Sequence, residues 1–393
     1  MKRNVDIGLF TTPSNLVGFN RGKMKKDLVL AGGGHAHMVS LANLHMFVEK
    51  GYHVTVIGPS QYHYYSGMGP GMLGKNYKPE EIRFATRHVV EKKGGRFLLG
   101  KVARIDPVAQ TVHLESGDSL SYDVLSCNLG SQVPEDIVSG GLEDIYMVKP
   151  IERLLKAQER IETLGSKKET TIGIVGGGPS AIEISGNVWR LIQQPGMKPA
   201  DIKILTSEQL MPHHPAGVRR KAVASLKGRG ITILENCNIR EIKAGRVREA
   251  TGDVHDLDII FVAVGIRPSK VFRKSGIPTG PDGGMLVNRY LQSTEYSNIF
   301  GGGDCIYFED GPLDKVGVYA VRQNPILYHN IMAALDGTAL KPFDPGGEYL
   351  LIFNLGDGTG IFYKWGIRFG GRLAFRIKDY IDRRFMKQFQ AIE

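Results

Sequence analysis

The stretch Asp27-Leu-Val-Leu-Ala-Gly-Gly-Gly-His-Ala-His37 decides the fold that this sequence predicts. Its apolar run, Leu28 to Ala31, is typical of a buried parallel strand, and a helical pattern of apolar residues follows the glycines. Strand, glycine turn and helix open a dinucleotide-binding unit, in which Gly32 permits the tight turn and Gly34 lets the backbone approach a pyrophosphate. Amides at the helix start then face the phosphates with the favourable end of the helix dipole. The third glycine of G-x-G-x-x-G is missing, because position 37 holds His37.

A second unit of the same kind begins at about residue 171. The run Thr171-Ile-Gly-Ile-Val175 predicts a strand, Gly176-Gly-Gly-Pro-Ser-Ala181 is a G-x-G-x-x-A turn, and a helical pattern continues to Ile192. This turn matches the dinucleotide pattern better than the first one does. We therefore expect Gly176, Gly178 and Ala181 to hold a second dinucleotide.

The acidic side chain that usually binds the ribose hydroxyls is missing or displaced in both units. The strand of the first unit ends in Gly58-Pro59-Ser60, so ribose recognition falls to Ser60, to backbone groups or to another element. In the second unit the strand is followed by Thr206-Ser207-Glu208, which places Glu208 one position further on. If Ser207 takes the position instead, Arg219 or Arg220 would favour a 2′-phosphate. The sequence does not separate NADH from NADPH.

A third signature closes the set. The segment Asn298-Ile-Phe-Gly-Gly-Gly-Asp304 predicts a strand that ends in Gly-Asp, which places the carboxylate of Asp304 at the edge of a sheet where ligands bind. Gly130, in Asn128-Leu-Gly-Ser131, is expected where another strand passes close to a ligand. A helix is predicted over 316–335, and Pro325 should kink it or mark its first turns.

Residues 61–77 combine aromatic side chains with many glycines. Five glycine or proline residues between positions 67 and 75 predict a packed loop rather than a helix. Tyr62, Tyr64 and Tyr65 are either core residues or a wall beside a flat aromatic ring.

Composition limits the classes of protein. A chain of 393 residues, with 42% hydrophobic and 23% charged residues, is long enough for two or three globular domains. It contains neither an apolar run long enough to span a membrane nor an apolar core of the signal-peptide kind. Its three cysteines, Cys127, Cys237 and Cys305, are far apart, so we expect no metal site and a cytoplasmic location. Cys127 and Cys237 are expected to be small buried residues.

The positive charge is concentrated at the two ends of the chain. Residues 1–26 and 364–393 each carry a net charge of +5, which accounts for the whole +10 and leaves the middle neutral. A nucleic-acid-binding protein would more often carry a basic stripe within its folded domain, so no nucleic acid is expected. An amphipathic basic segment over 373–389, with Leu373, Ile377, Ile381 and Phe385 at helical spacing, favours an anionic membrane surface. The alternative is a helix packed on the protein with a solvated basic face.

Taken together, these motifs make the chain resemble two-dinucleotide-binding-domain flavoproteins of the pyridine nucleotide-disulfide oxidoreductase superfamily. Within them it is similar to the branch of type II NADH dehydrogenases and sulfide:quinone oxidoreductases, and most of all to the flavoprotein domains fused to selenide, water dikinase. The resemblance extends over about residues 27–387 and is carried by Gly32-Gly-Gly-His-Ala-His37, Tyr65-Ser-Gly-Met68, Asp123-Val-Leu-Ser126, Gly317-Val-Tyr-Ala-Val-Arg-Gln323 and Lys378-Asp-Tyr-Ile-Asp-Arg-Arg-Phe-Met386.

The resemblance implies an α/β fold with two Rossmann-like domains, the second inserted in the first, and a C-terminal amphipathic extension. Residues 25–150 and 271–345 would form the FAD-binding domain, and 151–270 would form the NAD(P)H-binding domain. Residues 1–24 would be a tail, and 346–393 would form strands and the basic helix.

The resemblance also assigns site residues. FAD would lie at Gly32, Gly34 and His35, with Asp304 on its ribityl or pyrophosphate part. Glu183 would lie near the nicotinamide and the flavin. The helix from Gly317 and Val318 would point its amino end at the flavin, with Lys315 nearby.

The implied reaction passes hydride from NAD(P)H to FAD and electrons on to a quinone-type acceptor, at the inner face of the cell membrane. Two departures from the family weaken parts of this expectation. Gly317, Val318, Ala320 and Arg322 replace the Ala-Gln-x-Ala-x-Gln signature at the quinone end of the flavin. The cysteine pair that sulfide oxidation needs is absent, which disfavours that route.

Other functions stay open at this point. One is a flavoprotein reductase or dehydrogenase with a sulfur or selenium species or another small acceptor. Another is a non-enzymatic flavin-binding redox sensor. The sequence does not decide the oligomeric state, and a homodimer remains open.

Overall fold

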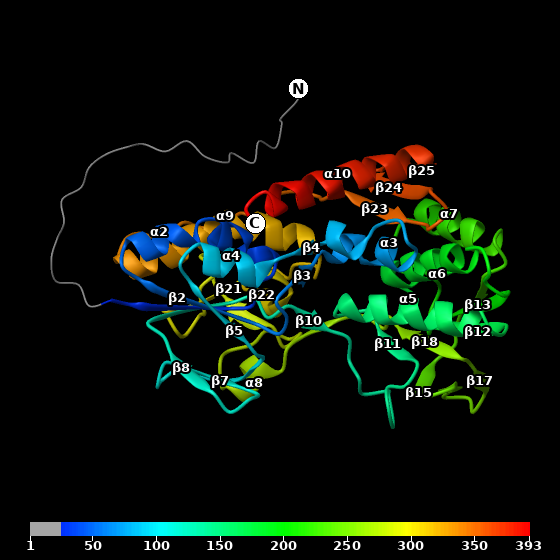
Figure 1. The fold of residues 1–393 in the computed structure, drawn as a ribbon, viewed down its shortest axis with the longest axis horizontal. Helices are drawn as coiled ribbons and strands as arrows, with labels where there is room; N and C mark the ends of the chain where they lie inside the picture. The colour runs from blue at the N-terminus through cyan, green and yellow to red at the C-terminus, as the bar shows by residue number, and fades with distance from the viewer. Residues whose placement is uncertain (1–24) are drawn as a thin grey trace.

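The computed structural model describes residues 25–393, so the predicted tail over 1–24 lies outside the described residues. Figure 1 shows two α/β units side by side along the longest axis, with the C-terminal helix (red) lying across them. Each unit consists of a parallel sheet with its helices, and we call the two units the first and the second layer. Among residues 25–393, no helix combines the length and apolar character that crossing a membrane requires.

The first layer is built on a five-stranded parallel sheet with the order β21-β9-β1-β2-β5. Its strands are β1 (Asp27–Ala31), β2 (His53–Gly58), β5 (Arg96–Leu99), β9 (Val124–Cys127) and β21 (Ile299–Gly301). The helices of this layer are α1 (Met38–Ala42), α2 (Leu44–Glu49), α4 (Thr86–Lys92), α8 (Val271–Lys274) and α9 (Gly317–Asp336). A 3₁₀ turn, His35–His37, precedes α1.

The second layer repeats this plan with the order β11-β18-β12-β13-β14, also parallel throughout. Its elements are β11 (Ile145–Met147), α5 (Glu152–Gly165), β12 (Thr170–Val175), α6 (Pro179–Ile192), β13 (Ala200–Leu205), α7 (Ala216–Lys227), β14 (Thr232–Leu234) and β18 (Ile259–Val262). Because β21 returns to the first sheet only after the second is complete, the second Rossmann-like unit is inserted in the first, as the sequence predicted.

Smaller sheets decorate both layers. The three-stranded ones are β6 (Val102–Asp106), β7 (Thr111–Leu114) and β8 (Ser119–Ser121); β15 (Ile239–Lys243), β16 (Arg246–Glu249) and β17 (Val254–Asp256); and β23 (Leu351–Asn354), β24 (Gly360–Lys364) and β25 (Ile367–Gly371). The two-stranded ones pair β3 (His63–Tyr64) with β4 (Arg83–Phe84), β10 (Ser131–Gln132) with β19 (Arg267–Pro268), and β20 (Met285–Val287) with β22 (Ile306–Phe308). The C-terminal helix is α10 (Arg372–Gln390), which packs against β23 and β24.

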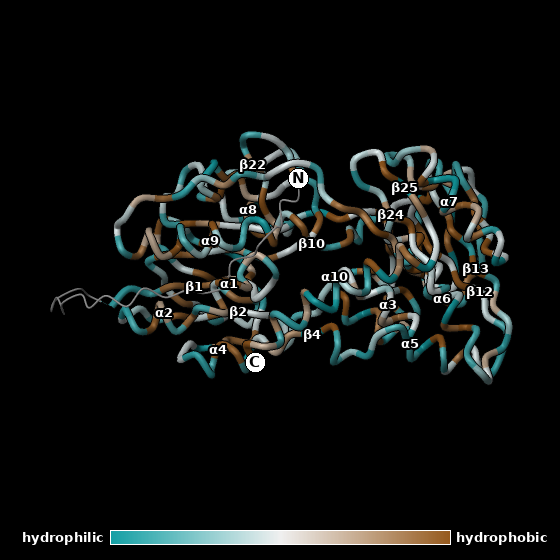
Figure 2. The backbone as a smooth tube through the Cα atoms, turned by 90° about the horizontal axis from the view of Figure 1, so that it is seen from above, coloured by the Kyte–Doolittle hydropathy of each residue, from teal (hydrophilic) through white to brown (hydrophobic). Residues whose placement is uncertain are grey.

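Each parallel sheet lies within its own hydrophobic core. The first core is centred on β1, β9 and α9, and the second on β12, β18 and α6. Figure 2 shows hydrophobic segments along the strands and hydrophilic ones along the outer loops. A parallel sheet covered on both faces is expected to have strands of this continuous apolar kind.

The prediction of a loop throughout 61–77 was wrong in part, because Gly69-Pro-Gly-Met-Leu73 forms a short buried helix, α3. Pro70 occupies its first turn, where a missing N–H costs nothing. The glycines fit because their neighbours leave no room for side chains: a Cβ at Gly71 would lie 2.4 Å from Tyr77, and one at Gly74 would lie 2.5 Å from Asn187. Packing against α5 and α6 therefore overrides the poor helix propensity of glycine.

Helix α9 runs unbroken for 20 residues with Pro325 well inside it. The expectation that Pro325 would mark the first turns of this helix was therefore wrong. The helix begins at Gly317 and ends at Gly337, whose φ of +71° is the usual left-handed C-terminal cap.

Candidate functional site

The first glycine turn fits closely against the loop that follows β9. Gly32 has φ +103°, its N–H donates to Ile57 O at 2.8 Å, and a Cβ there would lie 2.1 Å from Asn128 O. A Cβ at Gly34 would lie 2.9 Å from Asn128 Nδ2. Within residues 25–393, the buried Nδ2 of Asn128 has no hydrogen-bond partner. The glycines let a ligand approach the backbone closely, and a phosphate of a bound dinucleotide could accept a hydrogen bond from the unpaired Nδ2.

His37, at the missing third glycine, has a structural part. Its side chain is buried, with Nδ1 2.6 Å from Gly32 O and Nε2 2.8 Å from Ser126 Oγ. Since a carbonyl only accepts, Nδ1 carries the proton and donates to Gly32 O, and Nε2 accepts from Ser126. Burial lowers the pKa of His37 to about 4, so the ring is neutral and ties the turn to β9.

His35 is part of an aromatic wall. Its Nδ1 lies 3.0 Å from Nε2 of His63, and its ring contacts Tyr65 and stacks on Phe385 of α10. Burial, then the neighbouring His63, lowers the pKa of His35 to about 3, and burial followed by the charge of Lys149 lowers the pKa of His63 to about 4. Both rings are therefore neutral and present flat faces beside the turn.

Asp304 lies at the carboxyl end of β21, as predicted, and is held by two partners. Lys149 Nζ lies 2.9 Å and Ser131 Oγ 2.7 Å from its Oδ2. Burial alone would raise the pKa of Asp304, but Lys149 and Ser131 outweigh burial and lower it below its usual value. Gly130, beside Ser131, has φ +67° and open space where a Cβ would point. The carboxylate is thus ionised and fixed next to open space.

The amino end of α9 meets this site. Gly317 faces open space, no side chain caps the helix, and no acidic residue occupies its first turn, which includes Val318. Lys315 lines one small pocket with Asp304, but its ammonium is paired with Asp282 at 2.7 Å and also bonds Ile306 O. The free amides of α9, more than Lys315, therefore provide the positive end that favours an anion.

Arg322, in place of the family's second glutamine, ties α9 to a loop. Its Nη1 donates to Gly347 O at 2.9 Å and to Pro345 O. Backbone carbonyls thus occupy the guanidinium of Arg322. This agrees with the sequence, in which the departure from the glutamine signature weakens the expectation of a quinone contact at this position.

The second glycine turn is more open. Gly176 has φ +135°, and a Cβ there would lie 2.2 Å from Ala263 O, whereas nothing lies within 4 Å of a Cβ at Gly178. Gly178 is the N-cap of α6, Pro179 follows at its first position, and Ala181 is buried beneath the turn. The amides of a 14-residue helix therefore open directly to solvent, as anion binding requires.

The loop after β13 closes on this second turn. Met211 N donates to Gly177 O at 2.7 Å, and Glu208 lies exposed within the same loop. Ser60, the corresponding residue of the first unit, accepts a hydrogen bond from Tyr62 N at 3.2 Å. Both residues follow the second strand of their sheet, which is the position of a ribose partner.

Glu183 of α6 reaches a buried charged cluster on α10. Its Oε1 accepts from Asn354 N at 2.8 Å. Burial raises the pKa of Glu183, opposed by the nearby charge of Lys378. Lys378 Nζ pairs with Asp382 at 2.7 Å and donates to Gly67 O at 2.8 Å, and Tyr65 OH donates to Asp382 at 3.1 Å. One ammonium thus lies among two carboxylates directly behind the aromatic wall.

The outward face of α10 differs from the predicted apolar stripe. Leu373 is 62% and Ile381 42% exposed, but Phe385 turns inward onto His35. The buried face consists of Ala374, Lys378, Asp382 and Met386. The helix is therefore packed on the protein by one face, while part of the apolar stripe stays exposed on another.

Sequence reasoning missed Asn128 as a side chain, together with Lys149, His63, Lys378 and Asp382. Lys149 follows the apolar triplet of β11, so its place at a strand end was a usable signal. Lys378 and Asp382 share a helix face with Ala374 and Met386, and this four-residue spacing marks an inward face that contains charge.

The described cysteines offer no thiol chemistry at this site. All three are buried and free. Burial raises the pKa of Cys127 well above its usual value and the pKa of Cys305 to about 11, so both are neutral thiols.

Several known proteins are similar to this chain in sequence or in architecture. "Ferroptosis suppressor protein 1" of Taeniopygia guttata is 27% identical over 68% of this chain and 71% of its own length. A "Type II NADH:quinone oxidoreductase" of Staphylococcus epidermidis is 25% identical over 92% of this chain and 95% of its own. The solved sulfide:quinone oxidoreductase of Aquifex aeolicus has the same fold, with a TM-score of 0.75 at 19% identity over 94% of this chain and 92% of its own.

A family model extends the match across both glycine turns and the Gly-Asp strand. The model described as "Pyridine nucleotide-disulphide oxidoreductase" matches residues 26–333, which is well over half of the chain. The chain therefore belongs to the pyridine nucleotide-disulphide oxidoreductase family.

Proposed function

We propose that this protein is an FAD-dependent NAD(P)H dehydrogenase that passes electrons to a quinone-type acceptor. The observation that carries the proposal is the position of α6 between the two sites. Its amino end forms the second glycine turn, and its Glu183 lies in the charged cluster behind the aromatic wall of the first. Type II NADH:quinone oxidoreductases among the relatives support the acceptor class.

The proposal assigns the first site to FAD. Gly32, Gly34 and the amide of Asn128 hold its pyrophosphate, and Asp304 accepts from its ribityl hydroxyls. Bound FAD supplies a redox centre that takes two electrons from a nicotinamide and gives them to a second substrate. The free amides at Gly317 and Val318 would stabilise negative charge on a group bound at the amino end of α9.

The second site takes the nicotinamide cofactor. The open amides of α6 bind its pyrophosphate at Gly178, and Gly176 and Ala181 keep the turn close to the sheet. Glu208 is placed to accept from the ribose hydroxyls. With these assignments the proposal divides the chain as the sequence predicted, with 25–150 and 271–345 on FAD, 151–270 on NAD(P)H and 346–393 as the C-terminal extension.

We assign Glu183 as the proton donor of this reaction and Lys378 as the charged group beside it. Reducing a quinone to a quinol consumes two protons, so a group that holds one near the acceptor is needed. Burial raises the pKa of Glu183 against the opposing charge of Lys378, so Glu183 takes up a proton more readily than an exposed carboxylate and is the proposed proton donor. Lys378 keeps its charge because Asp382 and Glu183 outweigh its burial and raise its pKa.

The membrane-facing surface is proposed to be the outward side of α10 and the adjoining β24–β25 turn. This surface contains five exposed large apolar residues: Leu373, Tyr380, Ile381, Trp365 and Ile367. Five further exposed residues of α10 are basic: Arg372, Arg376, Arg383, Arg384 and Lys387. An apolar face bordered by arginine and lysine suits an anionic leaflet, and this supports the proposal that the protein binds peripherally to the inner face of the cell membrane.

Sedimentation with anionic vesicles tests this surface. Leu373→Glu with Ile381→Glu should abolish binding at moderate salt and leave the flavin in place. Val108→Glu is the matched control. Val108 is 84% exposed in the turn between β6 and β7, outside the proposed surface, so this substitution should not change vesicle binding. Undiminished binding of the double variant would refute this surface.

The activity itself is tested with a soluble quinone and NADH or NADPH. We expect quinone reduction by the wild type, with sulfide inactive as a donor. Glu183→Gln should lower kcat by on the order of 100-fold with little change in flavin content. Glu159→Gln, an exposed carboxylate on α5, should behave as wild type. Full activity of Glu183→Gln would remove its proposed role, and reduction of other acceptors alone would remove the quinone assignment.

A further inference from the structure

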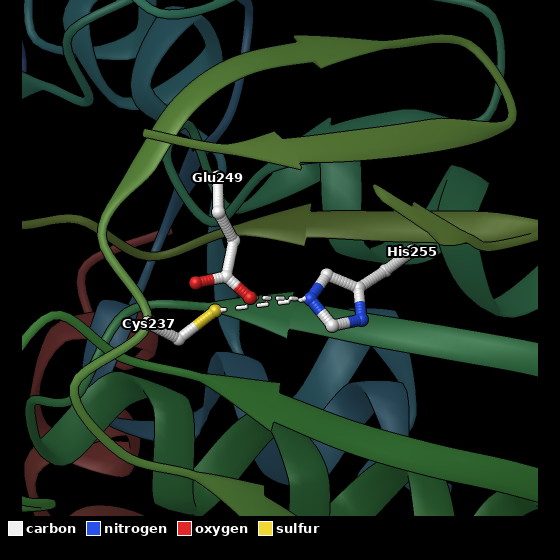
Figure 3. Close-up of side chains that lie close together, drawn as sticks. All are labelled: Cys237, Glu249 and His255. Carbon is white, nitrogen blue, oxygen red and sulfur yellow. Dashed lines mark hydrogen bonds and ion pairs between the residues drawn. The ribbon is translucent and has the colours of Figure 1, made fainter. Parts of the chain in front are cut away.

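A separate cluster of three metal-ligating side chains lies in the second layer. Cys237, Glu249 and His255 place one sulfur, one carboxylate oxygen and one ring nitrogen within 4.8 Å of one another. Figure 3 shows the sulfur and the oxygen both pointing at the same nitrogen of His255, while its other ring nitrogen points away. No sequence motif predicts this cluster, because its three residues lie 12 and 6 positions apart, which is not a known metal-binding spacing.

The local fold explains why these side chains converge. In the β15–β16–β17 sheet, Ile239 is paired with Glu249 and Val247 with His255. Since alternate residues share a face, Glu249 and His255 both lie on the face of Val247, and Cys237 comes just before β15, two positions from the Ile239 that pairs with Glu249. The strands, rather than flexible loops, therefore orient two of the three donors.

The distances are close to those of a small tetrahedral metal site. His255 Nε2 lies 2.7 Å from Glu249 Oε1 and 4.0 Å from Cys237 Sγ. Zinc bonds of ordinary length would set these two separations at about 3.3 Å and about 3.6 Å. Shifts of about half an ångström would thus bring all three donors onto one ion, with a water in the fourth position.

Burial further distinguishes the cluster from an ordinary surface ion pair. Cys237 is 4% exposed, and the side chains of His255 and Glu249 are 20% and 13% exposed. A metal ion would enter from the side of His255. The 4.0 Å between Cys237 Sγ and His255 Nε2 is long for a hydrogen bond, and burial together with a hydrogen bond to Glu249 raises the pKa of the thiol, so a metal ion would have to displace the thiol proton.

We propose that Cys237, Glu249 and His255 form a binding site for a zinc-class divalent cation. Binding releases the thiol proton of Cys237 to solvent and leaves sulfur, nitrogen and oxygen as ligands. Ligands of this mixed kind select zinc over magnesium or calcium, which prefer sites made of oxygen alone.

The site is linked to the second glycine turn through one residue. Cys237 N donates to Thr206 O at 2.8 Å, and the Thr206 hydroxyl lies against Gly177, where a Cβ would be 2.1 Å away. A metal on Cys237 would therefore fix the start of the loop that carries Glu208. We expect zinc to tighten nicotinamide binding by about fivefold. This coupling rests on the proposed function; the metal site itself does not.

Metal binding is tested on the full flavin-loaded chain by dialysis against zinc chloride and metal analysis. We expect one zinc per chain after gel filtration. Cobalt(II) in its place should give tetrahedral ligand-field bands at the red side of the flavin absorption. Cys237→Ser and His255→Gln should each weaken zinc binding by on the order of 100-fold. Retention of zinc by these variants, or its absence from the wild type, would overturn the site.

The matched control is His113→Gln, which changes a histidine on the corresponding small sheet of the first layer, where it bonds Ser119 at 2.7 Å. It should bind zinc as the wild type does. Unchanged flavin content and unchanged melting without zinc show that His255→Gln has folded.

Nicotinamide affinity, measured with and without zinc, tests the coupling separately. Equal affinities would overturn the coupling, whereas a protein that binds zinc but no nicotinamide would contradict the proposed function and leave the metal site standing.

Discussion

The two glycine turns of this protein share their backbone and differ in what surrounds it. A Cβ at Gly32 would lie 2.1 Å from Asn128 O, and one at Gly176 would lie 2.2 Å from Ala263 O. Both carbonyls belong to the loop after the neighbouring strand, so the same close approach recurs in each layer. The first glycine of each turn is therefore required by the sheet itself, whatever ligand is bound.

The turns diverge at the third and sixth positions. Gly34 is crowded by Asn128, whereas Gly178 faces open space. His37 fills the sixth position of the first turn and is hydrogen-bonded on both ring nitrogens, whereas Ala181 fills the sixth position of the second turn with a methyl group that forms no hydrogen bond. The first turn is thus the more crowded of the two, and the second is the more open. This difference matches a resident FAD and a substrate NAD(P)H.

The largest expected effect comes from Gly32→Ala compared with Gly176→Ala. Each substitution forces a Cβ into a carbonyl at a positive φ, which costs on the order of 3 kcal/mol locally. We expect Gly32→Ala to be purified without flavin. Gly176→Ala should remain yellow, with KM for the nicotinamide raised more than about tenfold. Flavin content by absorbance and steady-state kinetics measure both; loss of flavin from Gly176→Ala alone would contradict the assignment of the two turns.

A smaller effect separates the sixth positions. His37→Gly leaves Gly32 O and Ser126 without their partner and opens a cavity, which should destabilise the first layer by about 3 kcal/mol. Ala181→Gly should cost about 1 kcal/mol, because only helix propensity and a methyl group are lost. Urea midpoints followed by flavin fluorescence give the comparison. Equal midpoints for the two variants would mean that His37 does not fasten the turn.

Acid should loosen the first turn. His35, His37 and His63 have pKa values of about 3, 4 and 4 in the fold, below the 6.5 of a free histidine. The unfolded chain therefore binds more protons below pH 6.5, and stability falls as the pH is lowered through this window. Between pH 7 and about pH 5.5 each histidine should cost about 1 kcal/mol. His63→Asn should make the pH dependence of flavin release shallower, and His113→Gln should not; an unchanged slope in His63→Asn would argue against a buried neutral His63.

The smallest effect concerns nicotinamide selectivity. Glu208→Gln should raise the KM for NADH by about tenfold, equivalent to about 1.4 kcal/mol, and change the KM for NADPH less. The cause is the loss of a carboxylate that accepts from the ribose hydroxyls. An equal effect on both cofactors would show that Glu208 lies away from the ribose.

Much of the fold could be predicted because its signals are local. A strand, a glycine turn and a helix follow one another within about 20 residues in each unit, and Gly303-Asp304 follows the end of β21 at Gly301. Helix α3 could not be predicted, since Gly69 and Gly71 are favourable there only through contacts with α5 and Tyr77. Local propensity is a weak guide where tertiary packing decides.

The site was predictable to the same extent. Gly32, Gly176 and Asp304 follow from motifs, but the contact of Asp304 with Lys149 does not, because Lys149 follows β11, a strand of the other parallel sheet. The charged residues on the inward face of α10 could not be predicted from the sequence for a related reason. Lys378 and Asp382 satisfy one another and Gly67, so their burial needs contacts that only the folded chain supplies.

The most direct test of the whole account is an anaerobic titration of the purified flavoprotein with NADH and, in parallel, NADPH, following the flavin absorbance. The account predicts that one equivalent of a nicotinamide cofactor bleaches the flavin rapidly and that a soluble quinone restores the colour. If neither cofactor bleaches the flavin, the open turn at Gly176 to Ala181 does not deliver electrons to the first site, and the proposed function is wrong.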